Sequence, residues 1–301
     1  MARNDYRESY IMRGIVACLT ASLLVVPIAA NAKEAPVVSL AKTTKWEMNY
    51  DEDSCHLLAK FGQGEDGLLL RMTRYEPGDT LTLMLYGKIF DDKRVWVPVK
   101  IGFGAQPMRE SEAGAGTTAG KLPFIIFMNE RLDGIRSANA NTELRPVDRA
   151  IEAKTTSITV SLSGQKTYRI ETGSLAAPLQ AMRDCTDSLV KSWGYDLKSE
   201  ATLTKRPTPK GNPASWMTTR DYPLGALRAA QSGIVLFRLD VDATGKVAGC
   251  SVLSDLKPDA FSNITCGLLT KRAHFKPARD ETGRPTKSYY INQIRFVIPG
   301  D

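Results

Sequence analysis

The chain has 301 residues, of which 24% are charged, and a formal net charge of +7. No block of basic residues with interleaved aromatic side chains occurs in the sequence, so we expect no nucleic-acid partner. A charge of this size is ordinary for a soluble surface, and in a cell envelope it also suits anionic lipid or an acidic protein face.

The N-terminus has the three parts of a secretory leader. Arg3, Arg7 and Arg13 precede an apolar run at 15–30, which ends in small residues at 30–32. This run contains a proline and is shorter than the roughly 20 residues that span a bilayer, which argues against an uncleaved membrane anchor. We expect residues 1–32 to be a signal peptide cleaved after Ala32, which leaves an exported chain with a net charge of +6.

Cleavage leaves four cysteines: Cys55, Cys185, Cys250 and Cys266. An even number in an exported chain favours disulfides over metal or redox chemistry. Of the three possible pairings, one joins neighbours within each expected domain. We therefore expect the structural disulfides Cys55–Cys185 and Cys250–Cys266.

Residues 46–200 are rich in short β-branched and aromatic runs, separated by turn signals. The expected strands are 68–75, 80–87, 95–103, 122–128, 157–163 and 167–171. Their spacing predicts a β-rich domain, either an antiparallel sandwich or a partly closed barrel. The polar residues 33–45 are expected to be a disordered lead-in.

Residues 175–194 switch to helical spacing and are expected to form one helix at the end of this domain. That helix carries Cys185, so a bond to Cys55 ties the end of the domain to its beginning. Residues 201–216 contain three prolines and a glycine, and they are expected to be a linker.

Residues 217–301 predict a second, smaller α+β domain. A hairpin at 234–253, a helix at 259–272 and a closing strand at 288–299 make a three-stranded antiparallel sheet with one face covered by the helix. A Cys250–Cys266 bond between the second strand and the helix contributes about 3 kcal/mol. Zinc needs two further Cys or His ligands, and only His274 is near in sequence.

Several spaced elements of this domain occur in a characteristic order. They are Tyr222-Pro223 with Ala226, Gly233–Val241, Gly245–Val247, Thr265-Cys266, Arg272, Phe275–Ala278, Gly283–Pro285 and the strand to Phe296. In this pattern the segment resembles the C-terminal domain of TonB, the energy-transducing protein of the Gram-negative envelope. The resemblance covers about residues 217–301 and leaves the N-terminal domain unidentified.

The resemblance implies a periplasmic domain that binds extended segments of outer-membrane transporters, or of other envelope proteins, through a sheet edge. Main-chain hydrogen bonds then give affinity, and alternate side chains give selectivity. By position, the exposed edge is the last strand. Its outward face is expected to carry the partner-binding residues Tyr289, Ile291, Gln293 and Arg295.

The sequence departs from the TonB pattern in ways that bear on energy transduction. A transducer needs an uncleaved membrane helix and a long Pro-rich segment, whereas Pro207–Pro213 spans only about 20 Å. The family's usual Leu-Asp at the helix start reads Phe261-Ser262. We therefore expect this chain not to transduce energy alone.

Three motifs that imitate chemical sites are set aside. The stretch 115–121 resembles a phosphate-binding loop, but its first position is alanine and Leu122 follows its lysine, so a flexible surface loop is expected. The stretch 240–245 resembles the start of a calcium loop but is expected to be a hairpin turn. His56 adjoins Cys55, and neighbours on a strand face opposite sides, which is poor geometry for a Cys–His dyad.

We expect no catalytic residue, no metal and no cofactor. The first hypothesis is a periplasmic TonB-like protein-binding module associated with TonB-dependent outer-membrane transport. The alternatives are an envelope protein with a structural or cell-wall-binding role, in peripheral contact with the envelope, and an enzyme housed in the N-terminal β domain. The sequence indicates neither the partner nor the oligomeric state.

Overall fold

Ten strands of the N-terminal half form one continuous sheet in the computed structural model, which describes residues 36–92, 94–135, 145–162, 166–253 and 259–298. The strand order is β1-β10-β9-β6-β7-β8-β5-β4-β3-β2. The bounds are β1 Val37–Ala41, β2 Glu47–Tyr50, β3 Cys55–Phe61, β4 Leu68–Arg74, β5 Leu81–Tyr86, β6 Trp96–Phe103, β7 Arg109–Thr117, β8 Pro123–Glu130, β9 Ile158–Leu162 and β10 Thr167–Glu171.

This sheet curls until its first strand meets β3. Strand β1 pairs in parallel with β10, and the chain beyond it bridges β3 through Lys42 and Phe61. Two backbone hydrogen bonds close the contact: Thr43 N donates to the Lys60 carbonyl at 2.8 Å, and Gly62 N donates to the Ala41 carbonyl at 2.9 Å. The expected α+β class and the partly closed barrel are confirmed.

The interior of the curled sheet is filled by side chains. Alternate residues of each strand point inward, and Leu70, Leu83, Ile125 and Val160 have no exposed surface. The two 3₁₀ helices of this region are η1 (Gly64–Asp66) and η2 (Lys88–Phe90). The barrel therefore has a packed core.

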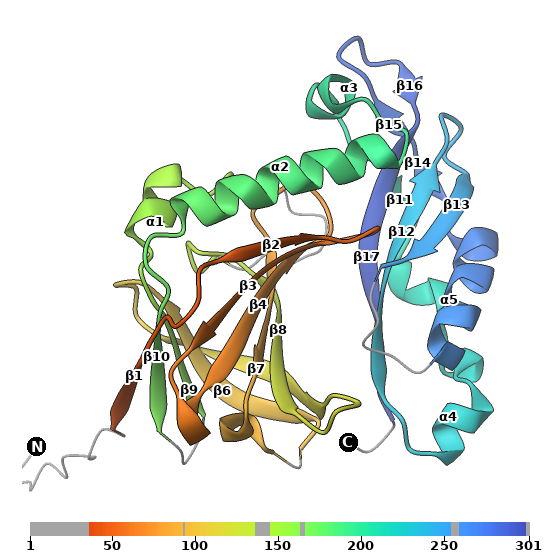
Figure 1. Cartoon of the computed structure of the whole chain (residues 1–301). Helices are drawn as coiled ribbons and strands as arrows, with labels where there is room; N and C mark the ends of the chain where they lie inside the picture. The colour runs from red at the N-terminus through yellow and green to blue at the C-terminus, as the bar shows by residue number, and fades with distance from the viewer. Residues whose placement is uncertain (1–35, 93, 136–144, 163–165, 254–258, 299–301) are drawn as a thin grey trace, which may run out of the picture. The chain divides into compact units, whose positions relative to one another are not determined.

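Helix α2 (Ala176–Ser192) lies across one end of the barrel (Figure 1). Leu179, Met182 and Leu189 are buried against the barrel interior, as their spacing predicts. Cys185 of this helix bonds to Cys55 of β3 with an S–S distance of 2.07 Å. The expected covalent link between the start and the end of the domain is present.

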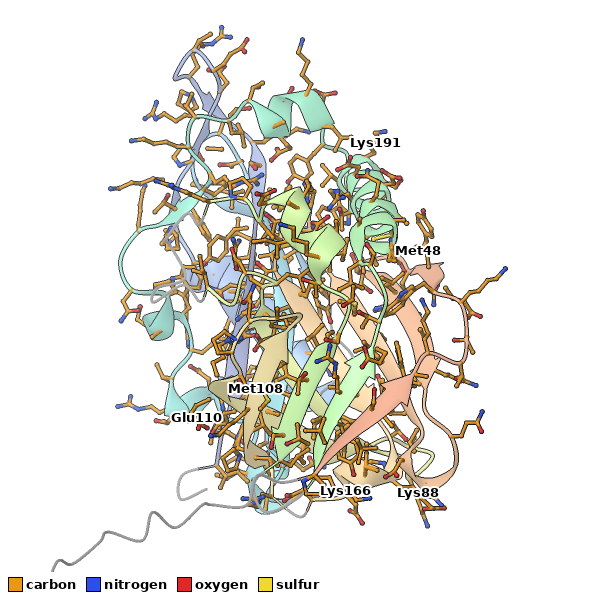
Figure 2. The ribbon with its side chains drawn as sticks, turned by 90° about the vertical axis from the view of Figure 1, so that its left-hand side faces the viewer. Met48, Lys88, Met108, Glu110, Lys166 and Lys191 are labelled. Atoms are coloured by element: carbon orange, nitrogen blue, oxygen red, sulfur yellow. A yellow bond between two sulfur atoms is a disulfide. The ribbon has the colours of Figure 1, made fainter. Side chains whose placement is uncertain are left out.

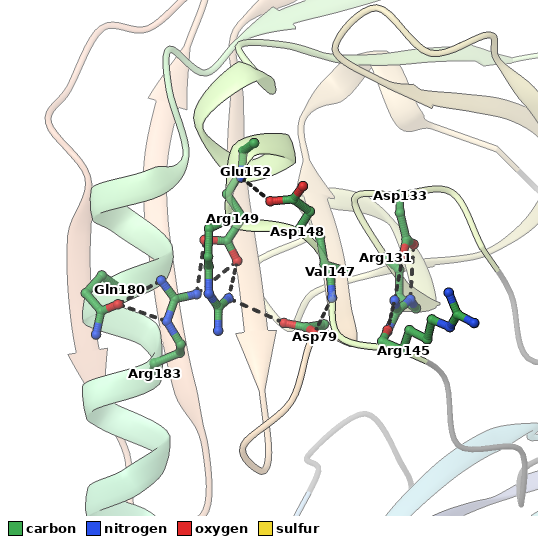
Figure 3. Close-up of polar contacts among 11 residues, drawn as sticks. Asp79, Arg131, Asp133, Arg145, Val147, Asp148, Arg149, Glu152, Gln180 and Arg183 are labelled. Carbon is green, nitrogen blue, oxygen red and sulfur yellow. Dashed lines mark hydrogen bonds and ion pairs between the residues drawn. The ribbon is translucent and has the colours of Figure 1, made fainter.

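A network of charged side chains fixes α2 and the short helix α1 (Arg149–Lys154) to each other (Figure 3). The carboxylate of Glu152, which is 1% exposed, accepts from Arg149 at 2.6 Å and from Arg183 of α2 at 2.9 Å. Asp79 accepts from the backbone of Val147 at 2.7 Å and lies 3.6 Å from Arg149. Each of these two carboxylates therefore has a cationic partner, and breaking one of the pairs would leave a buried charge uncompensated.

The opposite end of the barrel carries two exposed ion pairs on η1. Lys88 lies 2.9 Å from Glu65, and Lys166 lies 3.8 Å from Asp66. Figure 2 places both lysines at the end of the protein remote from Lys191 of α2. Exposed pairs of this kind contribute little to stability.

The C-terminal sheet has three strands in the order β13-β12-β17. Strand β12 (Gly233–Val241) pairs with both β13 (Val247–Val252) and β17 (Ser288–Phe296), always antiparallel. Helix α5 (Asp259–Arg272) covers one face, and Cys250 of β13 bonds to Cys266 of α5 with an S–S distance of 2.02 Å. The expected small α+β fold and its disulfide are present.

The segment between the two sheets is folded onto the C-terminal sheet. It contains α3 (Leu197–Ala201), β11 (Thr208–Pro209), η3 (Pro213–Trp216), η4 (Thr219–Asp221) and α4 (Leu224–Arg228), while short β14 (Phe275–Lys276), β15 (Ala278–Arg279) and β16 (Pro285–Thr286) follow α5. Strand β11 pairs with β14, and Trp216 is buried against Phe275. Residues 201–216, which are expected from composition to be a linker, are thus held against the C-terminal domain by Trp216.

The structure also differs from the sequence expectations near the N-terminus and in one loop. Residues 37–41, expected to be disordered, form β1, because the parallel pairing with β10 supplies their backbone partners. Residues 115–117, expected to be loop, belong to β7. The expected signal peptide and the turn at 163–165 lie outside the described residues. In the part of the chain that the structure describes, no helix is long and apolar enough to span a membrane.

By contacts between residues, the described residues from 36 to 298 belong to one compact unit. All contacts described below lie within Ala35–Asp301.

Candidate functional site

Strand β17 is an edge strand of the C-terminal sheet, as its position in the sequence predicts. Its side chains alternate between two environments. Tyr290, Ile294 and Phe296 belong to the clusters on the α5 side of the sheet. The four predicted partner-binding residues, Tyr289, Ile291, Gln293 and Arg295, point to the other side, where the N-terminal barrel lies against the sheet.

Tyr289 is only 2% exposed, because aromatic residues at the end of α2 surround it. Its ring lies 5.3 Å from that of Trp193 and 5.4 Å from that of Tyr195, both edge to face. The Arg206 guanidinium lies 5.5 Å above the ring. Burial raises the pKa of the Tyr289 phenol. This residue therefore serves as an internal contact rather than a solvent-exposed anchor.

Of the three other predicted residues, Ile291 and Arg295 contact the N-terminal half of the protein. Ile291 packs in the cluster around Tyr289. The Arg295 guanidinium lies 3.7 Å from the centroid of the Trp96 ring and 3.6 Å from the Glu112 carboxylate. Gln293 has a buried side-chain oxygen without a hydrogen-bond partner among the described residues. The four residues share one face of β17, as predicted, but the expectation that this face is open to solvent does not hold at Tyr289.

Arg238 of β12 is the residue of this contact that the sequence interpretation missed. Its guanidinium lies 4.3 Å from the Trp193 ring, and its nitrogens lie 3.5 Å from Asp53 and 3.3 Å from Asp240. The residue is 8% exposed. The sequence does contain a sign of this contact. Arg238 lies between Leu236 and Asp240 on the face of the sheet that α5 does not cover, and an arginine that becomes buried there needs a partner.

A groove of about 810 Å³ runs along β17 between this strand and the barrel. We call it the β17 groove. Its β17 wall consists of Tyr290, Ile291, Asn292, Gln293 and Arg295. Consecutive residues of a strand point to opposite faces, so a cavity that touches all of them follows the edge of the strand, where its backbone hydrogen-bonding groups lie.

The opposite wall of the β17 groove comes from the barrel and carries both signs of charge. Its lining residues are Glu76, Gly78, Asp79, Thr80, Trp96, Glu112, Ile126, Met128, Asn129, Arg131 and Pro146. Leu236 of β12 completes the floor. The mixture of apolar and charged groups suits a polypeptide segment better than a purely apolar ligand.

Glu76 is the group of this groove that titrates near neutrality. Burial raises the pKa of its carboxyl to about 7, although the Arg206 guanidinium acts in the opposite direction. The residue as a whole remains partly exposed. The charge of the groove therefore changes between mildly acidic and mildly basic pH.

The two histidines and the acidic turn at 240–245 lie in different parts of the fold. His56 lies 3.0 Å from Ser54 Oγ through Nε2 and 2.9 Å from Thr73 Oγ1 through Nδ1. Asp51 is also on the Nε2 side, at 3.7 Å, whereas a catalytic triad places its carboxylate on Nδ1. Asp242 accepts from the backbone of Thr244 at 2.8 Å, as expected of a hairpin turn. His274 is exposed.

Comparison with protein families gave one match: residues 218–298 match the family described as Gram-negative bacterial TonB protein C-terminal. Comparisons with curated proteins and with solved structures gave no match. The family match and the two disulfides indicate a protein of the cell envelope that interacts with other envelope or outer-membrane proteins. Residues 218–298 are thus a domain of the TonB C-terminal family.

Proposed function

We propose that this protein binds an extended segment of an outer-membrane transporter, or of another envelope protein, in the β17 groove. The added segment pairs with the free edge of β17, and its side chains contact the barrel wall. Backbone hydrogen bonds supply affinity that is independent of sequence, while pockets for alternate side chains supply selectivity.

The proposal rests on one observation about the lining of the β17 groove. A single cavity is lined by Tyr290, Ile291, Asn292 and Gln293, which include both faces of an edge strand. A ligand that fills this cavity has access to the backbone of β17 itself. The family match over the same domain supports the same mode of binding.

The barrel gives this groove a second wall, and this wall distinguishes the proposed site from an isolated sheet edge. Arg295 stacks on Trp96 of the barrel, so β17 and the barrel are fixed at that end of the groove. We propose that the N-terminal barrel thereby contributes to partner selection and performs no catalysis. Binding to the cell wall or a purely structural role is the alternative that the experiment below distinguishes.

We also propose that the mature protein is periplasmic, with the leader removed after Ala32. The apolar run at 15–30 and the two disulfides support export. On this proposal the protein acts as a soluble adaptor and does not transduce energy alone.

Crosslinking in the native host tests the site. The full chain is produced with a photoreactive phenylalanine analogue at Asn292 or at Gln293, and captured proteins are identified by mass spectrometry. The control places the same analogue at Ala248, which is exposed on β13, the opposite edge of the sheet.

We expect a discrete outer-membrane protein to be captured from 292 and 293 and not from 248. Equal capture from both edges, or no capture from β17 in a chain with intact disulfides, would remove the proposal. Capture of cell-wall fragments instead of a protein would favour the structural alternative.

A further inference from the structure

A second cavity, of about 540 Å³, lies on the outer face of the barrel. Strands β3 to β8 form its floor, and Ser232, Gly233, Ile234 and Leu253 of the C-terminal sheet form part of its wall. It shares only Trp96 and Ile126 with the β17 groove. A volume of this size is typical of small-molecule sites.

Five side-chain positions of this cavity form a straight row across neighbouring strands. Register pairs Arg71 of β4 with Met84 of β5, and Met84 with Ile126 of β8. Ile126 in turn pairs with Gly114 of β7, and Gly114 with Trp96 of β6. Four strand spacings separate the two ends, which corresponds to about 19 Å. The row thus has a cation at one end, an indole at the other and apolar surface between them.

Two glycines of β7 keep this surface flat. A Cβ at Gly114 would lie 2.9 Å from Ile126 Cγ2 and 3.4 Å from the Trp96 ring. A Cβ at Gly116 would lie 2.7 Å from the Phe124 ring. Because both positions lack a side chain, the neighbouring rings rest on the β7 backbone and leave the space above them open.

The guanidinium of Arg71 has few hydrogen-bond partners among the described residues. Its Nη2 donates to the Met84 thioether sulfur at 2.7 Å, and its guanidinium carbon lies 5.6 Å from the Tyr86 ring. Its Nε is buried without a hydrogen bond, and among the described residues Arg71 forms no ion pair. A thioether is a weak acceptor, whereas the guanidinium fork matches a carboxylate in geometry and charge. A carboxylate here would satisfy donors that are costly to leave unpaired.

We propose that this cavity binds an amphipathic carboxylate. The carboxylate pairs with Arg71, and an alkyl chain lies over Met84, Ile126 and Gly114 and ends at Trp96. The head is selected by charge and by the bidentate geometry of the guanidinium, and the chain by the apolar area that it buries. The ligand class is that of a medium- to long-chain fatty acid.

Isothermal titration of the full-length protein with dodecanoate, below its micelle concentration, tests the proposal. We expect saturable binding of one molecule per chain, and weaker binding of hexanoate because it buries fewer methylene groups. Dodecyltrimethylammonium, which has the same chain and the opposite charge, should bind at least about tenfold more weakly.

Variants locate the two ends of the ligand. Arg71→Gln should weaken dodecanoate binding by about tenfold or more, while Arg71→Lys keeps the charge and should give an intermediate affinity. Arg169→Gln, at an exposed position of strand β10, is the matched control and should leave affinity unchanged. Trp96→Phe should abolish the change in tryptophan fluorescence that accompanies binding.

The proposal is wrong if dodecanoate does not bind saturably to the wild-type protein, or if Arg71→Gln binds it with unchanged affinity. Circular dichroism confirms that the variant is folded. If Arg71→Gln does not fold, the comparison of dodecanoate with dodecyltrimethylammonium on the wild-type protein decides, because equal affinities exclude recognition of the carboxylate.

Discussion

The Tyr195 hydroxyl joins the end of α2 to the C-terminal sheet. It lies 3.0 Å from Asp240 Oδ1 and 3.2 Å from the Ser288 carbonyl oxygen, and both of these atoms are acceptors. Burial raises the pKa of this phenol, and the adjacent Asp240 carboxylate raises it further, so the hydroxyl stays protonated and donates. The contact therefore persists at any physiological pH.

Removal of this hydroxyl should weaken the protein without changing its fold. Tyr195→Phe keeps the ring against Tyr289 but leaves Asp240 with one donor fewer, and we expect a loss of about 1.5 kcal/mol in the free energy of unfolding. Urea denaturation measures it. Tyr50→Phe is the control, because Tyr50 is 59% exposed and its change should be near zero. Equal stabilities of the two variants would contradict the assignment.

Glu76 makes stability depend on pH. Its pKa rises from 4.5 to about 7 on folding, so the folded state binds more protons than the unfolded state between these values. The free energy of unfolding should therefore fall as the pH rises from about 4.5 to about 7, by an amount on the order of 1–3 kcal/mol.

Glu76→Gln tests this pH dependence, because glutamine stays neutral. The variant should gain stability relative to the wild type as the pH rises from 5 to 8, as followed by thermal unfolding in a pH series. Glu110→Gln, which changes an exposed carboxylate paired with Lys100, should show no such trend. A difference between Glu76→Gln and the wild type that is constant with pH would exclude Glu76 as the titrating group.

At the scale of elements, periodicity predicted the two long helices and missed the short helices α1, α3 and α4. The expected helix at 259–272 coincides with α5, and that at 175–194 contains α2. Each of these helices packs an apolar face against a hydrophobic core, and the spacing of the apolar residues within the helix is enough to predict that face. Strand β7 was missed because its sequence, RESEAGAGT, has little β-propensity. Its glycines leave room for the rings of Trp96 and Phe124 on neighbouring strands. The sequence of β7 alone does not show which side chains of other strands lie against it.

The two disulfides should differ in their effect on stability. Replacing Cys250 and Cys266 by serine opens a loop with a sequence separation of 16 and should cost about 3 kcal/mol. The Cys55–Cys185 bond spans 130 residues, and its loss should cost about 5 kcal/mol in the chain-entropy model. Chemical denaturation of each double serine variant gives the two values. The reverse order would indicate that native-state strain dominates over chain entropy.

At the scale of the whole protein, the sequence predicted two β-containing regions but not the contact between them. Helix α5 does not cover the second face of β12 and β17, and from the sequence of this domain alone that face is expected to be exposed to solvent. In the structure, Arg238, Tyr289 and Arg295 on this face contact the barrel and the end of α2. Such contacts join residues that are far apart in the chain, and the pattern of a single segment does not encode them.

A double-mutant cycle measures this contact. Trp193 and Arg238 lie 4.3 Å apart across the boundary, and we expect a coupling energy of about 1 kcal/mol between Trp193→Ala and Arg238→Ala in urea denaturation. Trp46, which packs edge to face against Phe61, shares no partner with Arg238 and should give a coupling near zero. Zero coupling at Trp193 as well would mean that the contact does not stabilise the protein.

The placement of the two sulfur bridges limits how far the polypeptide can be extended by force. A pull applied to its two ends cannot straighten the chain between Cys55 and Cys185, which has a contour length of about 430 Å. Most of the barrel strands lie inside that closed loop, whereas β12 and β17 lie outside both loops. Force on the two ends can therefore extend β12 and β17 while the closed loop still holds most of the barrel strands, and chemical reduction should lengthen the extension seen in single-molecule stretching.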